Sequence, residues 1–206
     1  MVTLHRDPAR TRQRILRAAR REFVAKGFAG ARVDAIARAA SVNKRMLYHY
    51  FGNKEALFRA IRREGIATNL DLVASAPADP ADLLPFLFGR ASKRVDGIRL
   101  LQWEALGRGD RKLIAEDERR KAWVEGGERL RDAQRAGRLH QDLDPEYLVL
   151  ALMALTMFPL AFPQLVRIVT GARVSDAEFR RRQDRFLRRL GACLRPQPPD
   201  IEEKHR

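Results

Sequence analysis

The chain has 206 residues, a mass of 23.6 kDa and an apolar fraction of 45%. It is long enough to bury a substantial core, and its one cysteine, Cys193, excludes an intramolecular disulfide framework and a cysteine-rich zinc site. The formal net charge is +15, from 41 Lys and Arg against 26 Asp and Glu. No apolar stretch follows the N-terminal arginines as in a secretory signal, so we expect a cytoplasmic protein.

The positive charge is concentrated near the N-terminus. Residues 1–52 contain twelve Lys and Arg but only three acidic residues, a net charge of +9. The rest of the chain is closer to balance. A basic segment on a nearly neutral body is typical of a nucleic-acid-binding head, although a solvated face without a partner would carry the same charge.

Apolar residues recur at helical spacing, and strand-like alternation is absent from the sequence, which predicts an all-α fold. In chain order we expect helices over residues 8–26, 32–40, 44–51, 53–73, 81–95, 97–106, 111–136 and 176–194. An apolar helical segment opens at Asp144-Pro145 between the last two, and Pro159 and Pro163 must kink or split it. Gly27 should end the first helix, and Gly126-Gly127 should weaken the long seventh one.

These elements divide the chain into three predicted parts. Residues 1–52 form a DNA-binding segment with a helix-turn-helix, and residues 53–194 form a larger helical domain for ligand binding and dimerisation. Residues 195–206 contain three prolines and are expected to be a disordered tail.

Residues 32–51 predict two short helices around the break Ser41-Val42-Asn43. This is the arrangement of a helix-turn-helix, whose second helix enters the major groove of DNA. On that helix Leu47 and Phe51 share one face, which should pack on Ile36 and Phe23.

The opposite face of the second helix is cationic and aromatic, with Lys44, Arg45, Tyr48 and His49 on it and Tyr50 near its edge. Arginine can make two hydrogen bonds to guanine, and the other side chains can bond phosphate. Alternatively, Tyr48 and Tyr50 are partly buried and close a small three-helix core.

The N-terminal sequence resembles the DNA-binding domain of TetR-type transcriptional regulators over about residues 8–60. The similarity lies in Ile36-Ala37, Ala40, Val42-Asn43-Lys44, Leu47-Tyr48-His49-Tyr50-Phe51 and Asn53-Lys54-Glu55-Ala56-Leu57-Phe58. The resemblance implies an all-helical dimer, with a three-helix head that binds DNA and a larger helical domain that binds a small effector and dimerises.

By position, the resemblance implies that eight residues contact DNA: Arg32, Lys44, Arg45, Met46, Tyr48, His49, Tyr50 and Lys54. The residues that open the recognition helix would face bases, and the others would mostly bond phosphates. Members of the family often have Thr where this chain has Arg32, and an arginine side chain cannot cap a helix. Arg45 is larger than the residue often found at its position, which suggests a guanine contact particular to this protein.

Residues 147–166 are almost purely apolar, a length that suggests a membrane span. Two prolines, Thr156 and Gln164 interrupt the run and acidic residues flank its start, so we expect no membrane association. We interpret it as a helix buried on all sides, followed by a shorter one.

A monomer has difficulty covering such a helix, so this segment and the last helix could pack against the same pair in a second chain. TetR-type dimers are typically built in this way. Alternatively, both helices line the core of their own chain. The candidate interface residues are Leu152, Leu155, Phe179, Phe186, Leu187 and Leu190.

An effector pocket should be apolar and enclosed by helices. The candidate lining residues are Phe86, Leu101, Gln102, Trp103, Trp123, Met153, Met157 and Phe158, each of which could instead be plain core. The segment around Trp103, with Gln102 and Glu104, is the strongest candidate. The sequence does not identify the ligand.

The sequence contains no glycine-rich phosphate loop, no H-E-x-x-H and no G-x-S-x-G motif, and its histidines are scattered singly. We therefore expect no enzyme, no metal and no cofactor. The predicted function is a DNA-binding regulator, most simply a repressor that binds an inverted-repeat operator as a homodimer and is released by a small-molecule effector. The rivals are a nonspecific DNA-compacting protein, an activator of the same fold, and a small-molecule enzyme with an incidental basic head.

Overall fold

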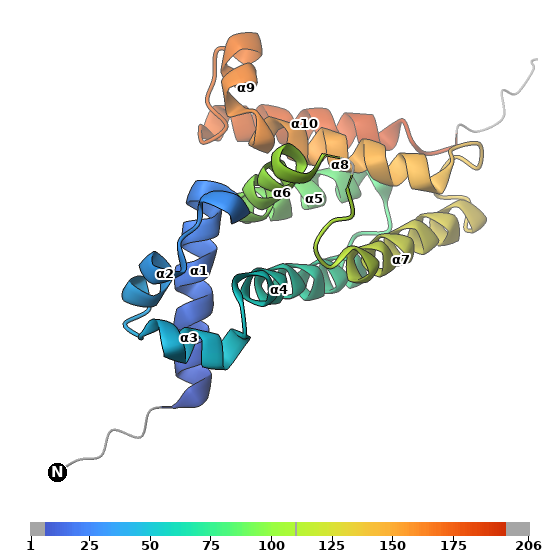
Figure 1. Ribbon diagram of the computed structural model, residues 1–206. Coiled ribbons are helices and arrows are strands. Elements are labelled where there is room, and N and C mark those ends of the chain that lie inside the picture. Colours follow the sequence, from blue (N-terminus) through green and yellow to red (C-terminus); the bar gives the residue numbers. More distant parts are fainter. Residues whose placement is uncertain (1–6, 110, 197–206) are drawn as a thin grey trace, which may run out of the picture. The chain divides into compact units, whose positions relative to one another are not determined.

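The computed structural model describes residues 7–109 and 111–196, and these residues form only helices, turns and loops, which confirms the all-α prediction. The last ten residues of the predicted tail lie outside the described residues. In chain order the helices are α1 (Pro8–Gly30), α2 (Val33–Ala39), α3 (Lys44–Phe51), α4 (Lys54–Ala74), α5 (Pro80–Ser92), α6 (Val95–Arg108), α7 (Glu116–Arg135), α8 (Pro145–Ala161), α9 (Pro163–Thr170) and α10 (Ala177–Ala192) (Figure 1).

The chain forms two compact units. The first comprises residues 1–71 and 95–122, and the second comprises residues 72–94 and 123–206. The first unit therefore contains α1, α2, α3 and α6 with most of α4 and the start of α7. The second contains α5, α8, α9 and α10 with the rest of α7. The predicted boundary of the DNA-binding segment at residue 52 stays a prediction.

The core of the first unit holds α2 and α3 against α1. Phe23, Ile36 and Leu47 are completely buried in it, as the helical spacing predicts. The ring of Phe58, at the start of α4, packs edge-on against that of Phe23 with 5.0 Å between centroids. Burial of one such side chain stabilises the fold by about 1.5–3 kcal/mol, so the orientation of α3 is set by this core.

Polar side chains cap three helices at the starts that the sequence predicts for those helices. The Asp7 carboxylate accepts a hydrogen bond from the backbone N–H of Ala9 at 2.9 Å, and the Asn43 side chain accepts one from Met46 at 2.7 Å. Asp144 caps α8 in the same way, through Glu146 N–H at 2.8 Å. Each cap satisfies a backbone donor that has no partner within its helix.

Gly27 interrupts α1 at the predicted end of the first helix. Its φ of 69° and ψ of 179° are non-helical, in a region that is essentially restricted to glycine. Trp103 of α6 packs on it, because a Cβ at Gly27 would lie 2.8 Å from Cδ2 of the indole. The Trp103 Nε1–H also donates to the carbonyl oxygen of Val24 at 3.2 Å. Within the first unit, α6 is thus fastened to the end of α1.

In the second unit, α5 packs against both α8 and α10. Leu84 of α5 and Leu187 of α10 are fully buried there. The two helices approach closely at Gly191, and at the surface Arg195 pairs with Asp79 at 2.5 Å. Leu187 and Gly191 are one turn apart, so a single face of α10 makes the contact.

The apolar segment divides into α8 and α9 at Phe162, while Pro159 stays inside α8. The two helices are bent by 87° at the break. Within the described ranges no single helix has the length and apolar character to cross a bilayer, and only this bent pair does so by length and composition.

The expectation that the first of these helices is buried on all sides is wrong. Tyr147 is 74% exposed and Leu150 is 60% exposed, whereas Leu148 and Leu152 are buried. The reason is that α5 covers one face of α8 and leaves an apolar face uncovered within the chain.

The long helix α7 begins at Glu116 rather than at residue 111. Ala115 has a positive φ of 57°, which no helix can continue through, and the Glu116 carboxylate accepts a hydrogen bond from Leu113 N–H at 2.7 Å. From there α7 runs without a break through Gly126-Gly127.

Candidate nucleic-acid interface

Helix α3 has one face in the core and one in solvent. Leu47 is fully buried and Phe51 is 8% exposed, whereas Lys44, Arg45 and His49 are exposed. The buried residues fix the rotation of the helix about its axis. The exposed face therefore carries Lys44, Arg45 and His49, three of the side chains that the sequence predicts for contact with DNA.

The two tyrosines of α3 differ in environment. Tyr48 is 38% exposed, whereas Tyr50 is half-buried and packs against the core of the first unit. The rings of His49 and Tyr50 meet edge-on with 5.8 Å between centroids. The alternative in which a tyrosine closes the core thus applies to Tyr50, and Tyr48 remains on the outer face with Lys44 and Arg45.

Two cations interact across the contacts of α3 with its neighbouring helices. Lys44 Nζ lies 3.2 Å from a carboxylate oxygen of Asp34 in α2, an exposed pair of the kind that contributes little and exchanges readily for another anion. The Arg12 guanidinium of α1 lies 5.3 Å from the centroid of the Phe51 ring. Sequence reasoning missed Arg12 as a neighbour of α3, because only the packing of α1 against α3 brings it there.

Arg32 precedes α2 without capping it, as expected for an arginine at this position. The cap comes from α1 instead: Glu22 Oε1 accepts a hydrogen bond from the backbone N–H of Arg32 at 3.2 Å. Glu22 also accepts one from Lys26 Nζ at 2.9 Å. The Arg32 side chain is exposed, so it is available for a phosphate while Glu22 orients the start of α2.

The charge of Glu22 should therefore matter for stability. Its hydrogen bond from Lys26, reinforced by the one from Arg32 N–H, lowers the pKa of Glu22 below its ordinary 4.5. A carboxyl whose pKa is lower in the folded than in the unfolded state stabilises the fold above its unfolded pKa. This stabilisation is lost as the pH falls through the folded value.

Glu22→Ala is expected to reduce the free energy of unfolding by about 1 kcal/mol at pH 7, the usual value of a lost helix cap. Urea unfolding at a series of pH values should show the difference from wild type shrinking as the pH falls below 4.5. Glu55→Ala is the control, because Glu55 pairs with Arg59 on an exposed face of α4 and contributes less. A constant difference down to acid pH would contradict the capping role.

Lys54 lies at the start of α4, against the end of α1. Its Nζ donates to the carbonyl oxygen of Ala29 at 3.2 Å and lies 5.0 Å from the centroid of the Phe28 ring. Burial lowers the pKa of Lys54, and the charge of Glu22 opposes that change. An ammonium has three donors, so the bond to Ala29 leaves capacity for a phosphate oxygen.

Lys54→Ala is expected to weaken binding to all DNA sequences by a similar factor and to reduce the salt dependence of binding. The slope of log K against log salt concentration should fall by about 1 per head, the contribution of one phosphate contact. Titrations of specific and scrambled duplexes at several salt concentrations measure both effects. A selective loss on one sequence would contradict the phosphate contact.

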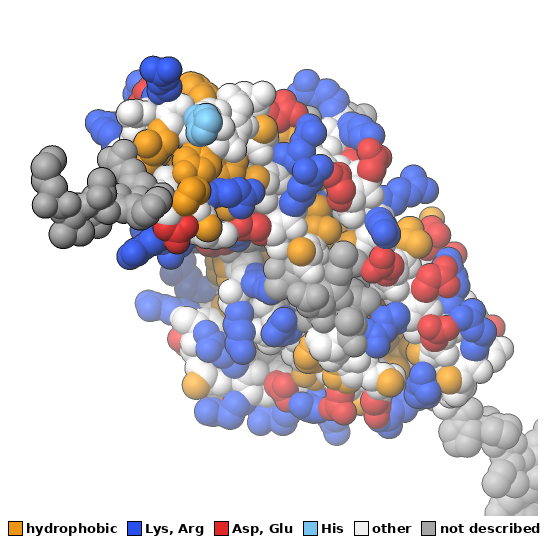
Figure 2. All heavy atoms as spheres, turned by 90° about the horizontal axis from the view of Figure 1, so that it is seen from below, with side chains coloured by type: hydrophobic (Ala, Val, Ile, Leu, Met, Phe, Trp, Pro, Cys, Tyr) orange, Lys and Arg blue, Asp and Glu red, His pale blue; other side chains and the backbone are white. Residues whose placement is uncertain are grey.

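Figure 2 shows one face of the molecule, on which Lys and Arg side chains are widely spread, with Asp and Glu among them over much of it. The positive side chains visible on this face are therefore not confined to one stripe. The outer face of α3 presents exposed cations together with the exposed ring of Tyr48.

The residues predicted to line an effector pocket are divided between the two units. Leu101, Gln102 and Trp103 belong to the first, and Phe86, Trp123, Met153, Met157 and Phe158 belong to the second. Trp103 is 41% exposed and is engaged with Gly27 and Val24. The lining role of all eight stays a prediction.

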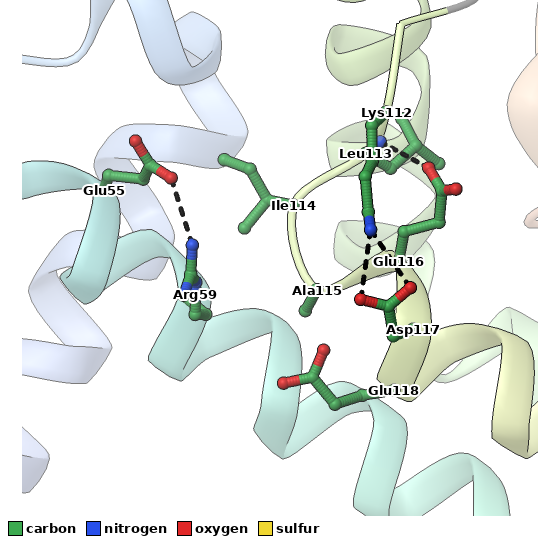
Figure 3. Close-up of a pocket in the computed structure, with 9 residues that line it drawn as sticks. All are labelled: Glu55, Arg59, Lys112, Leu113, Ile114, Ala115, Glu116, Asp117 and Glu118. Carbon is green, nitrogen blue, oxygen red and sulfur yellow. Dashed lines mark hydrogen bonds and ion pairs between the residues drawn. The ribbon is translucent and has the colours of Figure 1, made fainter.

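One pocket of about 370 Å³ opens in the first unit, and none of those eight residues lines it. Figure 3 shows side chains of α4 on one side and those of residues 112–118 on the other. Several of its charged groups are paired with each other, as Arg59 with Glu55 and Lys112 with Asp117. It is thus a polar surface hollow, unlike the enclosed apolar pocket expected from the sequence.

The predicted interface residues differ in their exposure. Leu152, Phe179 and Leu187 are buried within the second unit, Leu155 and Leu190 are half-buried, and Phe186 is 56% exposed. The alternative in which these helices line their own core therefore accounts for the buried three. The interface role of the set stays a prediction.

A short cationic and aromatic helix, held by a three-helix core behind a capped turn, defines a helix-turn-helix protein. Comparison with known families agrees with this class. The model of the bacterial regulatory proteins of the tetR family matches residues 15–61, and that of the tetracyclin repressor-like C-terminal domain matches residues 79–189. The chain belongs to the TetR family of DNA-binding transcriptional regulators.

Individual relatives match along most of the chain. The HTH-type transcriptional repressor SCO4008 of Streptomyces coelicolor is 35% identical over 169 residues, which are 81% of this chain and 86% of that protein. The HTH-type transcriptional regulator UidR of Escherichia coli is 29% identical over 177 residues, 78% of this chain and 85% of its own.

Solved structures share the architecture. SCO4942 of Streptomyces coelicolor superposes with a TM-score of 0.75 at 30% identity, over 91% of this chain and 99% of its own. GusR of Salmonella enterica superposes with a TM-score of 0.67 at 25% identity, over 92% of this chain and 97% of its own.

Proposed function

We propose that this protein is a repressor that binds an inverted-repeat operator as a homodimer and is released from it by a small-molecule effector. The observation that carries the proposal is the outer face of α3, where Lys44, Arg45 and Tyr48 are exposed while Leu47 anchors the helix in the core. Such a helix can enter the major groove without any change in the fold of the head.

The proposed DNA contacts are the eight predicted residues. Arg45 reads guanine, Lys44 exchanges Asp34 for a phosphate, and Arg32 and Lys54 bond phosphates from the start of α2 and α4. The geometry that supports this is the exposure of Arg32, Lys44 and Arg45 and the spare donors of Lys54.

The proposed dimer uses the uncovered face of α8 together with α10. Tyr147, Leu150 and Phe158 recur at helical spacing on α8 and are 74%, 60% and 49% exposed, and Phe186 of α10 is 56% exposed. A second copy would bury this apolar face and place two heads on successive major grooves, about 34–36 Å apart or a multiple of that.

Selection from a random pool of DNA duplexes tests the proposal. Enrichment of an inverted repeat, bound by two chains per duplex in sedimentation experiments, supports a dimeric repressor. Binding without enrichment would instead indicate a nonspecific compacting protein. A chain that is monomeric at micromolar concentration, or that binds no duplex in dilute buffer, would overturn the proposal.

A further inference from the structure

Three charged side chains from three helices of the first unit meet in its interior. Arg62 belongs to α4, Glu104 to α6 and Arg119 to α7, and their side chains are only 12%, 4% and 8% exposed. Arg119 Nη2 donates to both carboxylate oxygens of Glu104 at 2.8 Å, and Arg62 Nε lies 3.5 Å from Glu104 Oε2. We refer to these three residues as the buried charge cluster.

The buried charge cluster carries an excess of positive charge. Two guanidinium groups face one carboxylate, so the cluster has a net charge of +1. Burial, together with the charges of Arg119 and Arg20, lowers the pKa of Arg62 to about 10, while the charge of Glu104 opposes this change. Arg62 is therefore still protonated at neutral pH, and the cluster retains an uncompensated charge that is costly to bury.

The cluster also has donors without acceptors. Arg62 Nε and Arg119 Nε and Nη1 are buried and have no hydrogen-bond partner among the described residues. A buried donor left unpaired destabilises a fold, and more so when it is charged. The cluster thus lacks one negative charge and acceptor oxygens, and a carboxylate supplies both.

We propose that the buried charge cluster binds the carboxylate group of a small organic effector, held by Arg62 and Arg119. One negative charge neutralises the cluster, whereas a phosphate dianion would leave it negative. The inference rests on the effector-controlled DNA binding proposed above, and it adds the chemical class of the effector and the residues that recognise it.

Helix α6 connects the cluster to the DNA-binding head. Glu104 follows Trp103 in the chain, and the Trp103 indole packs on Gly27 and donates to Val24 at the end of α1. A ligand carboxylate competes with Glu104 for Arg119, and this changes the strength of the ion pair that joins α7 to α6. Because α6 contacts α1 directly, the ligand and the DNA then favour different arrangements of the first unit.

Thermal unfolding of the full chain tests the binding site without DNA. The probes are benzoate and straight-chain monocarboxylates from acetate to decanoate, each compared with the corresponding neutral amide and with inorganic phosphate. A bound carboxylate at about 100 times its dissociation constant should raise the melting temperature by about 5–10 °C, and the amide should not. A response to phosphate alone, or to no carboxylate of the set, would overturn the proposal.

Variants locate the site. Arg62→Met should lose the response to carboxylates while melting at the same or a higher temperature without ligand, because it leaves a neutral Arg119–Glu104 pair. The control is Arg63→Met on the same helix, since Arg63 is exposed and pairs with Glu118, and it should respond like wild type. Arg119→Met gives a second loss of response where it folds. A response that persists in Arg62→Met would place the site elsewhere and overturn the proposal.

The effector role is measured separately, by DNA release. A carboxylate that raises the melting temperature should also weaken operator binding by about 5–150-fold in wild type and in Arg63→Met. A melting shift without DNA release would overturn the role of the site as the effector site. A chain that binds no DNA would refute the proposed function, while the melting experiments would still decide whether the carboxylate site exists.

Discussion

Arg45→Ala is expected to remove most of the preference of this protein for its operator over other DNA. Arg45 lies exposed in the first turn of α3, the recognition helix. A bidentate contact between arginine and guanine contributes about 1–3 kcal/mol of discrimination. A dimer uses two such contacts, so operator affinity should fall by about 2–6 kcal/mol, whereas affinity for scrambled DNA should fall far less.

The matched control for this prediction is Arg45→Lys. Lysine keeps the positive charge but lacks the planar pair of donors that fits guanine, so it should retain nonspecific affinity and lose the preference. Competition between operator and scrambled duplexes at one salt concentration measures the ratio. An equal loss of affinity on both duplexes in the alanine variant would show that Arg45 only neutralises phosphate.

Gly191→Ala is expected to destabilise the second unit by about 3 kcal/mol, because overpacking against an immobile group costs 1–3 kcal/mol or more. A Cβ at position 191 would lie 2.1 Å from the Pro80 carbonyl oxygen and 2.9 Å from Ala81 Cα, both backbone atoms at the start of α5. The clash can be relieved only if α10 moves away from α5. The melting temperature should fall by about 6–12 °C.

Gly126→Ala is the control for this prediction, and it should not destabilise the protein. Gly126 also lies inside a helix, but a Cβ there meets no atom within 4 Å. Alanine is about 1 kcal/mol more favourable than glycine in a helix, so this variant should be as stable as wild type or more stable. Thermal and urea unfolding followed by circular dichroism compare the two. A Gly191→Ala variant as stable as wild type would show that α10 and α5 are not packed as closely as described.

The helices of this protein could be predicted because their signals are local. Asp7, Asn43 and Asp144 each cap a helix through backbone groups two or three residues away. Gly27 interrupts α1 through its own backbone angles. The buried face of α3 follows from the spacing of Leu47 and Phe51, and the outer face, with its candidate DNA contacts, follows from the same geometry.

Features that join distant segments could not be predicted in this way. Glu22 caps α2 from α1, and Trp103 of α6 packs on Gly27 of α1. The exposure of Tyr147 was missed because the apolar sequence of α8 does not state which of its faces α5 covers.

The sequence by itself determined the helical class, the starts of the helices with local caps and the composition of the recognition helix, since each depends on contacts within about one helical turn. Only the tertiary structure decided that Arg62, Glu104 and Arg119 share one buried site. Their meeting depends on how α4, α6 and α7 pack together, which is set by the sum of many side-chain contacts across the core, and no local pattern in the chain encodes it.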